Sequence, residues 1–375
     1  MGGIRIGRIF GIDIAIHASW FIILAFFAFS LATSFFPSVY VWSPATYWIV
    51  AVIAALLLFV SVLAHELGHA LIALRQGIPV KSITLFLLGG VASIEKDPVS
   101  PGREAVLAGV GPLVSLAIGA ATLALSQTLP GPEHVVAVLF YLGVANISLA
   151  IFNMLPGFPM DGGRVLRALL WWRSSDFLKA TRHAAVVSRF MGFGFILLGV
   201  YQLLGRGGFG GIWLAFIGWM LIQASRASVQ QVQLEQGLKG VTAGRLASAP
   251  QAWLPPFITL NVAAHDYFAE LHERCLPVES EREGEPYDGA LCVTDFERTP
   301  REEWDTARAR DAMTHADKIP TVEADVPAFD AIRLMAEKGV GQVAVIEAGR
   351  LLGFVDQDGA LRFLQRRKAL GETSS

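Results

Sequence analysis

The chain contains 375 residues with a formal net charge of -2 at pH 7, and 53% of its residues are hydrophobic while 17% are charged. Soluble chains carry about 25% charged residues, so this composition excludes an ordinary soluble globular domain. The small net charge and the lack of a dense basic tract argue against nucleic-acid binding. Apolar blocks fill residues 1–230, whereas residues 231–375 are rich in charged side chains. The sequence therefore predicts two domains that face different solvents.

Six apolar segments are long enough to predict membrane-spanning helices. They cover residues 14–36, 47–73, 105–125, 135–155, 184–204 and 209–227. No small-residue cleavage motif follows the first segment, so we expect a retained anchor and not a signal peptide. Between the second and third segments, residues 78–91 show a strand-like pattern that ends near the glycine pair Gly89-Gly90. The predicted fold class is thus a polytopic α-helical membrane protein with one short β segment.

The distribution of basic residues predicts the orientation of these segments. The parts predicted to face inside include Arg8, Arg75 and Lys179, whereas the outer loops at residues 37–46 and 130–134 contain no lysine or arginine. This bias follows the positive-inside rule. It predicts that the N-terminus and the C-terminal region both lie in the cytosol.

The second apolar segment ends in the stretch His65-Glu66-Leu67-Gly68-His69. A charged side chain at the centre of a bilayer span costs about 2.5–3.5 kcal/mol, so ionisable residues there indicate function. On a helix, His65 and His69 share one face, as two zinc ligands must. Glu66 lies beside them, where a carboxylate can accept a proton from water. The first hypothesis is a zinc hydrolase site built inside a membrane.

A hydrolytic zinc site usually has three protein ligands, so this hypothesis needs one more. The best candidate is Asp161, which lies in the stretch Asn-Met-Leu-Pro-Gly-Phe-Pro-Met-Asp-Gly-Gly-Arg at residues 153–164. The predicted topology sets Asp161 on the same side of the membrane as His65 and His69. Two prolines preclude an unbroken regular helix there, and the glycines after Asp161 allow close backbone approach. The sequence therefore predicts that Asp161 is the third ligand.

Residues 241–370, which follow a linker at residues 231–240, show a weak duplication with copies at about 241–300 and 309–367. Each copy reads as a β-α-β-β-α unit, so a small paired α+β module is predicted. Cys275 and Cys292, the chain's two cysteines, both lie in this part. Because the module is predicted to be cytosolic, we expect two free thiols and no disulfide.

Taken together, His65-Glu66-Leu67-Gly68-His69 and the stretch at 153–164 resemble the motifs of the site-2 protease family of intramembrane zinc metalloproteases. The pairs Gly89-Gly90 and Gly111-Pro112 are also similar to that family. The resemblance covers about residues 1–230 and implies one zinc ion per chain, held by His65, His69 and Asp161, with Glu66 as the general base. It further implies that Asn153 helps to position the substrate.

Residues 241–370 resemble a pair of cystathionine-β-synthase-type (CBS) modules, which one branch of the site-2 protease family carries. The match is looser, because Asp356 replaces the usual threonine and Asp358 shifts the expected acid. The resemblance implies an adenine nucleotide as a ligand, regulation of the protease by the module, and a homodimer formed through it. It also implies a bacterial or archaeal cell membrane and, as a partner, a transmembrane protein substrate within the lipid bilayer.

Two other classes of function compete with the protease hypothesis. An ion transporter or channel regulated by CBS modules would also join a polytopic membrane domain to such a pair. Glu66 discriminates between them, because a protease needs this residue for turnover but not for metal binding. A proteolytically dead scaffold is disfavoured, because every expected catalytic residue is present. The sequence does not identify the substrate.

Overall fold

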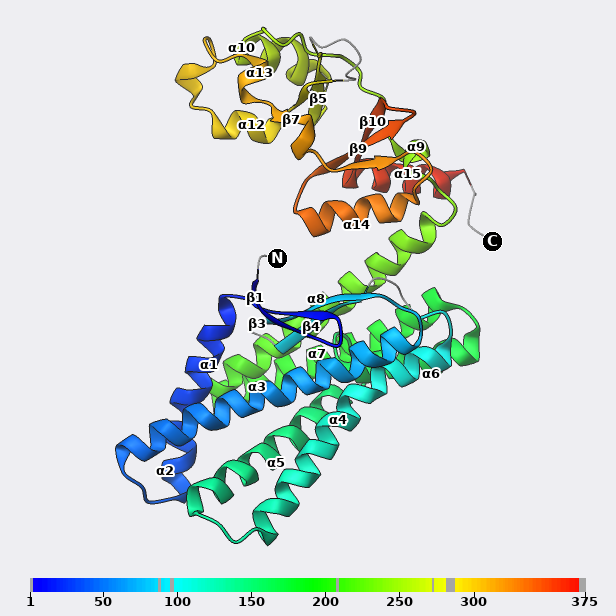
Figure 1. Ribbon diagram of the computed structural model, residues 1–375. Helices are drawn as coiled ribbons and strands as arrows, with labels where there is room; N and C mark the ends of the chain where they lie inside the picture. The colour runs from blue at the N-terminus through cyan, green and yellow to red at the C-terminus, as the bar shows by residue number, and fades with distance from the viewer. Residues whose placement is uncertain are drawn as a thin grey trace. The chain divides into compact units, whose positions relative to one another are not determined.

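The computed structural model describes residues 3–370 except 87–88, 95–97, 207–208, 272 and 281–286. The chain forms two compact units, Met1–Val232 and Gln233–Ser375. Figure 1 shows the long helices of the first unit and the small sheets of the second. Six helical segments in the described part are long and apolar enough to cross a membrane, which confirms the predicted polytopic fold.

The helices of the first unit follow the predicted apolar segments. The first span, Ser19–Val39, combines α1 (Ser19–Ser30), a π-helical turn (Leu31–Phe35) and α2 (Phe36–Val39). The others are α3 (Pro44–Arg75), α4 (Pro101–Thr128), α5 (Glu133–Asn153), α6 (Asp161–Ser174), α7 (Phe177–Arg206) and α8 (Phe209–Gly237). Of these, the 14-residue α6 is not among the candidate spans.

Two of these helices begin at serine caps that are followed by proline. Ser43 accepts a hydrogen bond from the Thr46 amide at the start of α3, and Ser100 accepts one from the Arg103 amide at the start of α4. A serine cap satisfies an amide that has no partner within the helix, and proline at the next position loses nothing because its amide hydrogen is absent. The local sequence thus specifies where α3 and α4 begin.

A four-stranded sheet lies in the first unit beside α3 (Figure 1). Its order is β1 (Ile4–Ile9), β2 (Ile12–Ile16), β3 (Val80–Phe86) and β4 (Gly89–Ile94), with β2 and β3 parallel and the other pairs antiparallel. The strand-like segment predicted between the second and third spans is therefore β3 and β4. The N-terminal hairpin was not predicted, and the first span begins at Ser19 instead of residue 14.

The hairpin forms because its isoleucines alternate with polar or small residues, which is the period of a strand and not of a helix. Ile12 and Ile14 are buried, and they pack with Ile83 of β3 against Ala70 and Ala73 of α3. The sheet is therefore fixed to the half of α3 that carries His65 and His69.

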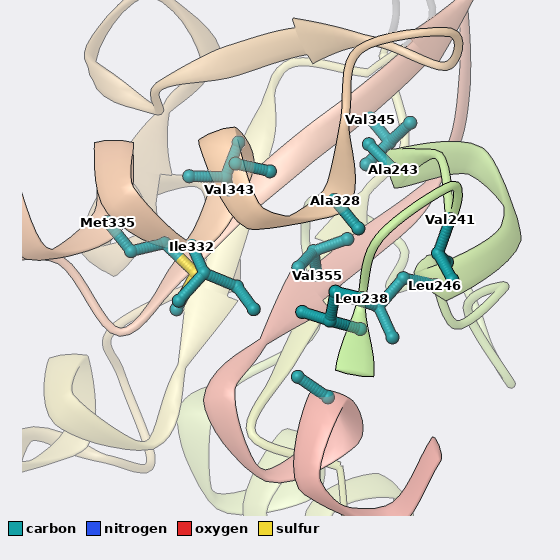
Figure 2. Packing of buried hydrophobic residues seen from close by; sticks show 12 residues of the cluster. Leu238, Val241, Ala243, Leu246, Ala328, Ile332, Met335, Val343, Val345 and Val355 are labelled. Atoms are coloured by element: carbon teal, nitrogen blue, oxygen red, sulfur yellow. The ribbon is translucent and has the colours of Figure 1, made fainter. Parts of the chain in front are cut away.

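The second unit contains two three-stranded sheets, with strand orders β10-β9-β8 and β5-β6-β7. The strands are β5 (Cys275–Val278), β6 (Gly289–Cys292), β7 (Thr314–His315), β8 (Thr321–Glu323), β9 (Gln342–Glu347) and β10 (Arg350–Asp356). Helices α14 (Ala328–Lys338) and α15 (Gln357–Ala369) accompany the first sheet. Figure 2 shows its core, where Ile332 and Met335 of α14 face Val343 and Val355 of the strands.

The shorter helical pieces of the second unit connect these strands. They are α9 (Ala243–Leu246), α10 (Leu260–Val262), a π-helical turn (Ala263–Phe268), α11 (Ala269–Leu271), α12 (Val293–Arg298), α13 (Ala309–Ala312) and 3-10 turns at Arg301–Glu303 and Ala316–Lys318.

The expectation of two free thiols is wrong, because Cys275 and Cys292 form a disulfide. The register of the antiparallel strands β5 and β6 sets these two residues directly opposite each other, with their Cα atoms 4.0 Å apart. The strand pairing that brings the sulfurs together joins residues 17 positions apart. Cysteine spacing alone does not reveal such a pairing.

Candidate active site

The two predicted histidine ligands lie on α3, well inside the first unit. Their side chains are nearly inaccessible, since His65 is 4% and His69 is 5% exposed. Residues four apart on a helix point to the same side, and the two imidazole Nε2 atoms lie 3.2 Å from each other. α3 is a candidate membrane span, so these polar rings occupy a site within an apolar helix.

The predicted third ligand, Asp161, is the first residue of α6. Because α5 ends at Asn153, the chain turns through residues 154–160 before α6 begins. The glycines after Asp161 are required by this turn: a Cβ atom on Gly162 would lie 2.3 Å from the Met154 carbonyl oxygen, and one on Gly163 would lie 2.5 Å from the Gly157 carbonyl carbon. Only glycine permits the loop to fold back on the helix start.

The structure brings the three predicted ligands together. Asp161 Oδ2 lies 3.2 Å from His65 Nε2 and 3.2 Å from His69 Nε2, and these atoms form the metal-capable cluster in the described part of the chain. Ligand atoms that lie about 2.0–2.1 Å from a tetrahedral zinc ion are about 3.3 Å from one another. All three separations therefore fit a zinc ion held between these atoms.

The Nδ1 atoms of both imidazole rings have hydrogen-bond partners. A partner that fixes the proton on Nδ1 leaves a lone pair on Nε2. His69 Nδ1 lies 2.7 Å from the Leu107 carbonyl oxygen, and His65 Nδ1 lies 2.9 Å from Ser115 Oγ. A carbonyl oxygen only accepts, so His69 Nδ1 carries the proton and Nε2 of the neutral ring presents a lone pair. That lone pair faces the acceptor Oδ2 of Asp161, and a cation between them satisfies both.

Glu66 lies next to this cluster and under the edge strand of the sheet. A Cβ atom on Gly90 of β4 would lie 2.4 Å from Glu66 Cγ, so only the absence of a side chain at Gly90 leaves room for Glu66. The ionisable neighbours of the Glu66 carboxyl are His69, Asp161 and Arg164. The predicted general base therefore lies within the same small site as the predicted ligands.

Asn153, the predicted substrate-positioning residue, is the last residue of α5 and is half-buried. The loop that leads to Asp161 starts directly after it. Its role in positioning a substrate stays a prediction.

Two residues of α4 that were not predicted as site residues complete the surroundings of the imidazoles. Ser115 is fully buried and contacts His65, and a Cβ atom on Gly111 would lie 2.2 Å from His69 Nε2 and 2.6 Å from His65 Nε2. A serine inside a predicted apolar span was the available signal for Ser115. The family resemblance noted Gly111 without a role, and its close approach to both rings supplies one.

The second unit contains a separate cavity of about 500 Å³ between its two halves. Arg274, Arg298 and Lys318 line it together with Thr294 and Asp295, and the disulfide-bonded cysteines also border it. Burial raises the pKa of the Asp295 carboxyl, although the Cys292 amide and Arg298 partly offset this effect. The cavity thus combines basic side chains with a buried acid.

A buried site of two histidines and one aspartate, with a glutamate beside it on a membrane-length helix, defines an integral-membrane metallohydrolase. The profile of peptidase family M50 matches residues 53–135 and 131–198, and the CBS domain profile matches residues 309–366. Sll0528 of Synechocystis sp., which carries a zinc metalloprotease name, is 32% identical over 371 residues and is matched over 98% of this chain and 96% of its own length.

Rip3 of Mycobacterium tuberculosis also carries a zinc metalloprotease name and is 32% identical over 365 residues, which cover 96% of this chain and 92% of Rip3. The solved site-2 protease from Methanocaldococcus jannaschii is 29% identical, with a TM-score of 0.43, and the match covers 61% of this chain and 95% of that one. The chain belongs to peptidase family M50, the site-2 proteases, and it carries a CBS domain. This confirms the predicted zinc metalloprotease and decides against the transporter alternative.

Proposed function

We propose that this metalloprotease hydrolyses peptide bonds within or near the membrane-spanning segments of protein substrates, using His65, His69 and Asp161 as zinc ligands and Glu66 as general base. The observation that carries the proposal is the convergence of the three ligand atoms, 3.2 Å apart, where Asp161 at the start of α6 meets His65 and His69 on the membrane-length helix α3, with Glu66 beside them. The substrate class follows from the location, because a site on such a helix is reached most directly by another segment within the bilayer.

Different residues of the chain bind the metal, transfer the proton and orient the imidazole rings. When bound by His65, His69 and Asp161, zinc supplies a Lewis acid that polarises the peptide carbonyl group and activates water. Glu66 accepts the proton of the attacking water and then donates it to the nitrogen of the leaving amine. Leu107 and Ser115 hold the two imidazole rings in the orientation that directs both Nε2 atoms inward.

The edge strand β4 supports a way of presenting the substrate to this site. A helical substrate has its carbonyl groups in internal hydrogen bonds, so it must unwind before water attacks. β4 is the last strand of its sheet, and its Gly90 lies against Glu66. An unwound substrate segment pairing with β4 would bring an extended peptide next to Glu66.

Metal content and proteolysis, measured on the same full-length preparations, test this proposal. The variants are Asp161→Ala and Glu66→Gln, each purified in detergent and dialysed with the wild type. We expect about one zinc ion per wild-type and Glu66→Gln chain, and loss of zinc from Asp161→Ala. The proteolysis probe is a Leu/Ala-rich single-span peptide with a central Gly-Pro pair, which only zinc-loaded wild type should cleave.

Three outcomes contradict different parts of the proposal. Zinc retained by Asp161→Ala means that the third ligand is another residue. Cleavage of soluble casein but not of the single-span peptide by the zinc-loaded wild type removes the membrane substrate class while leaving the protease intact. Cleavage of the peptide by Glu66→Gln excludes Glu66 as the general base.

We further propose that residues 241–370 form a tandem CBS module, with copies at about 241–300 and 309–367, after a linker at 231–240. The positive-inside bias supports a cytosolic location for this module and for the N-terminus. The cavity lined by Arg274, Arg298, Lys318 and Asp295 supports adenine-nucleotide binding, because basic side chains suit phosphates and a carboxylate suits a ribose hydroxyl. Regulation of the protease and self-association through the module remain part of the proposal.

Titration of the full-length protein with AMP and ATP in a calorimeter tests the ligand. Arg298→Gln should weaken ATP binding, because Arg298 borders the cavity, whereas Arg245→Gln on α9, outside its lining, is the control. No heat of binding for either nucleotide would contradict the ligand assignment. Zinc content should stay the same in both variants.

A further inference from the structure

Three arginines border a hollow between α7 and α8, and none of the predicted zinc-site residues lines it. The hollow is about 470 Å³ in volume, and Arg182 and Arg189 of α7 and Arg226 of α8 line it. All three residues lie within candidate membrane spans. Arg189 and Arg226 also lie inside the apolar segments predicted from the sequence alone, at residues 184–204 and 209–227.

Close glycine contacts fix how α7 and α8 are aligned. A Cβ atom on Gly192 would lie 2.6 Å from the Gly218 carbonyl oxygen, and one on Gly199 would lie 2.4 Å from that of Gly211. Both contacts fit one antiparallel alignment of the two helices. Gly199 lies seven residues after Gly192 on α7, and Gly211 lies seven residues before Gly218 on α8. The same alignment sets residue 226 opposite residue 184, at a level between Arg182 and Arg189.

The arginines therefore line the hollow from both helices, two from α7 and one from α8. Its floor consists of small or buried side chains, and Ala185 is 2% exposed while Ser225 is fully buried. Because these side chains are small or buried, the hollow has room for a group that enters from the surface. Two residues seven apart on α7 lie on one side of that helix, so both can reach the same group.

No carboxylate among the residues that the structure describes pairs with these arginines. The one hydrogen bond given by their side chains runs from Arg226 Nη1 to Gln223 Oε1 at 3.4 Å. A charged group within a membrane span is costly unless it is paired or reaches the interface, and in a span it usually has a functional partner. These arginines are exposed and have no carboxylate partner in the described part of the chain, so they are open to an external anion.

An apolar track continues from the arginines along the same side of α7. Phe193 and Leu197 follow Arg189 at spacings of four and eight residues and are 55% and 70% exposed. Phe190, next to Arg189, is 74% exposed. This arrangement places cationic groups at one end of a stripe that faces lipid, which is the pattern of a phospholipid with its headgroup and its acyl chains.

We propose that Arg182, Arg189 and Arg226 bind the phosphate of an anionic phospholipid, whose acyl chains lie along Phe190, Phe193 and Leu197. Arginine suits this ligand because its planar donors form paired hydrogen bonds with phosphate oxygens. The shared chemistry is an anionic phosphate group, and a free phosphate ion is the other source of it. The site is independent of the proposed proteolytic mechanism.

Native mass spectrometry of the full-length protein in detergent tests the proposal, with equimolar dioleoyl phosphatidylglycerol and dioleoyl phosphatidylcholine as probes. We expect the wild type to retain phosphatidylglycerol preferentially. Each basic residue near a membrane surface strengthens anionic-lipid binding about fivefold, so Arg189→Gln/Arg226→Gln should weaken it about 25-fold. The matched control is Arg75→Gln/Arg173→Gln, which removes two exposed arginines of α3 and α6 that do not line the hollow and should weaken retention far less.

Two additions keep the test decisive. Thermal unfolding in detergent checks that the glutamine pair folds. If it does not, Arg189→Lys/Arg226→Lys, which keeps both charges but loses the paired donors, should show a clearly reduced preference for phosphatidylglycerol. Equal retention of both lipids by the wild type, or unchanged phosphatidylglycerol binding in a folded glutamine pair, would overturn the proposal. Saturable binding of inorganic phosphate without a preference for phosphatidylglycerol would replace the lipid with a free anion.

Discussion

The carboxylate of Glu104 and the guanidinium group of Arg167 form an ion pair inside the first unit, with Arg167 Nε donating a 2.7 Å hydrogen bond to Glu104 Oε1. Glu104 is fully buried and Arg167 is 6% exposed. The guanidinium group also lies 4.6 Å from the centre of the Phe177 ring. Glu104 belongs to the first turn of α4, and Arg167 lies in α6 after Asp161. The pair therefore joins the helix that orients His69 to the helix that carries Asp161.

Removing one partner of this pair should destabilise the protein and loosen the zinc site. Glu104→Ala leaves the Arg167 charge buried without its partner, which typically costs about 3–5 kcal/mol. We expect a lower unfolding temperature in detergent and faster zinc loss to a chelator. The control is Asp176→Asn, which removes the exposed pair with Lys179 and should cost about 0–1 kcal/mol. A Glu104→Ala protein that unfolds like the wild type would contradict this account.

Ser115 should contribute to zinc affinity although it does not contact the metal. Ser115→Ala removes the partner of His65 Nδ1, and loss of such a hydrogen bond typically lowers metal affinity about 10–100-fold. Competition with a fluorescent zinc chelator measures the change. Ser126→Ala on the same helix is the control, because the Ser126 hydroxyl donates to the Leu123 carbonyl of its own helix and should leave affinity unchanged. Equal affinity of both variants would show that Ser115 is dispensable.

Gly111 should be intolerant of even a single methyl group. In Gly111→Ala the new Cβ atom would lie 2.2 Å from His69 Nε2, so a ring must move out of the geometry that fits zinc. We expect zinc content to fall well below one ion per chain while the protein remains folded by circular dichroism. Gly109→Ala, two residues earlier on α4, meets no atom within 4 Å and serves as the control. Full zinc content in both variants would contradict the steric argument.

The parts of this structure that depend on local pattern could be predicted from the sequence. The six long apolar segments predicted six spans, and the structure contains six candidate spans. Helical spacing and the predicted topology indicated that His65, His69 and Asp161 lie together, as they do in the structure. The glycines after Asp161 were expected to allow close approach, and the contacts of Gly162 and Gly163 with the preceding loop explain why.

The parts that depend on pairing between distant segments could not be predicted in the same way. The N-terminal hairpin was merged into the first span, because Ile12 and Ile14 are as apolar as a membrane helix and only their pairing with β3 distinguishes them. Ser115 was missed because a serine in an apolar span indicates a polar contact but does not identify its partner, the imidazole 50 positions away. The disulfide was missed for a similar reason, since it depends on the register of β5 and β6.

The disulfide should be detectable chemically and should stabilise its own part of the second unit. Iodoacetamide should add no mass to the denatured protein before reduction and should modify both cysteines after it. Disulfides contribute about 2–4 kcal/mol, mainly by restricting the unfolded chain. Cys275→Ser/Cys292→Ser should therefore speed hydrogen exchange in peptides from β5 and β6 by about 30-fold or more, since 1.4 kcal/mol corresponds to a factor of ten. Peptides from β9 and β10, in the other sheet, serve as the internal control. Alkylation of both thiols without reduction would show that the pair is not joined in the purified protein.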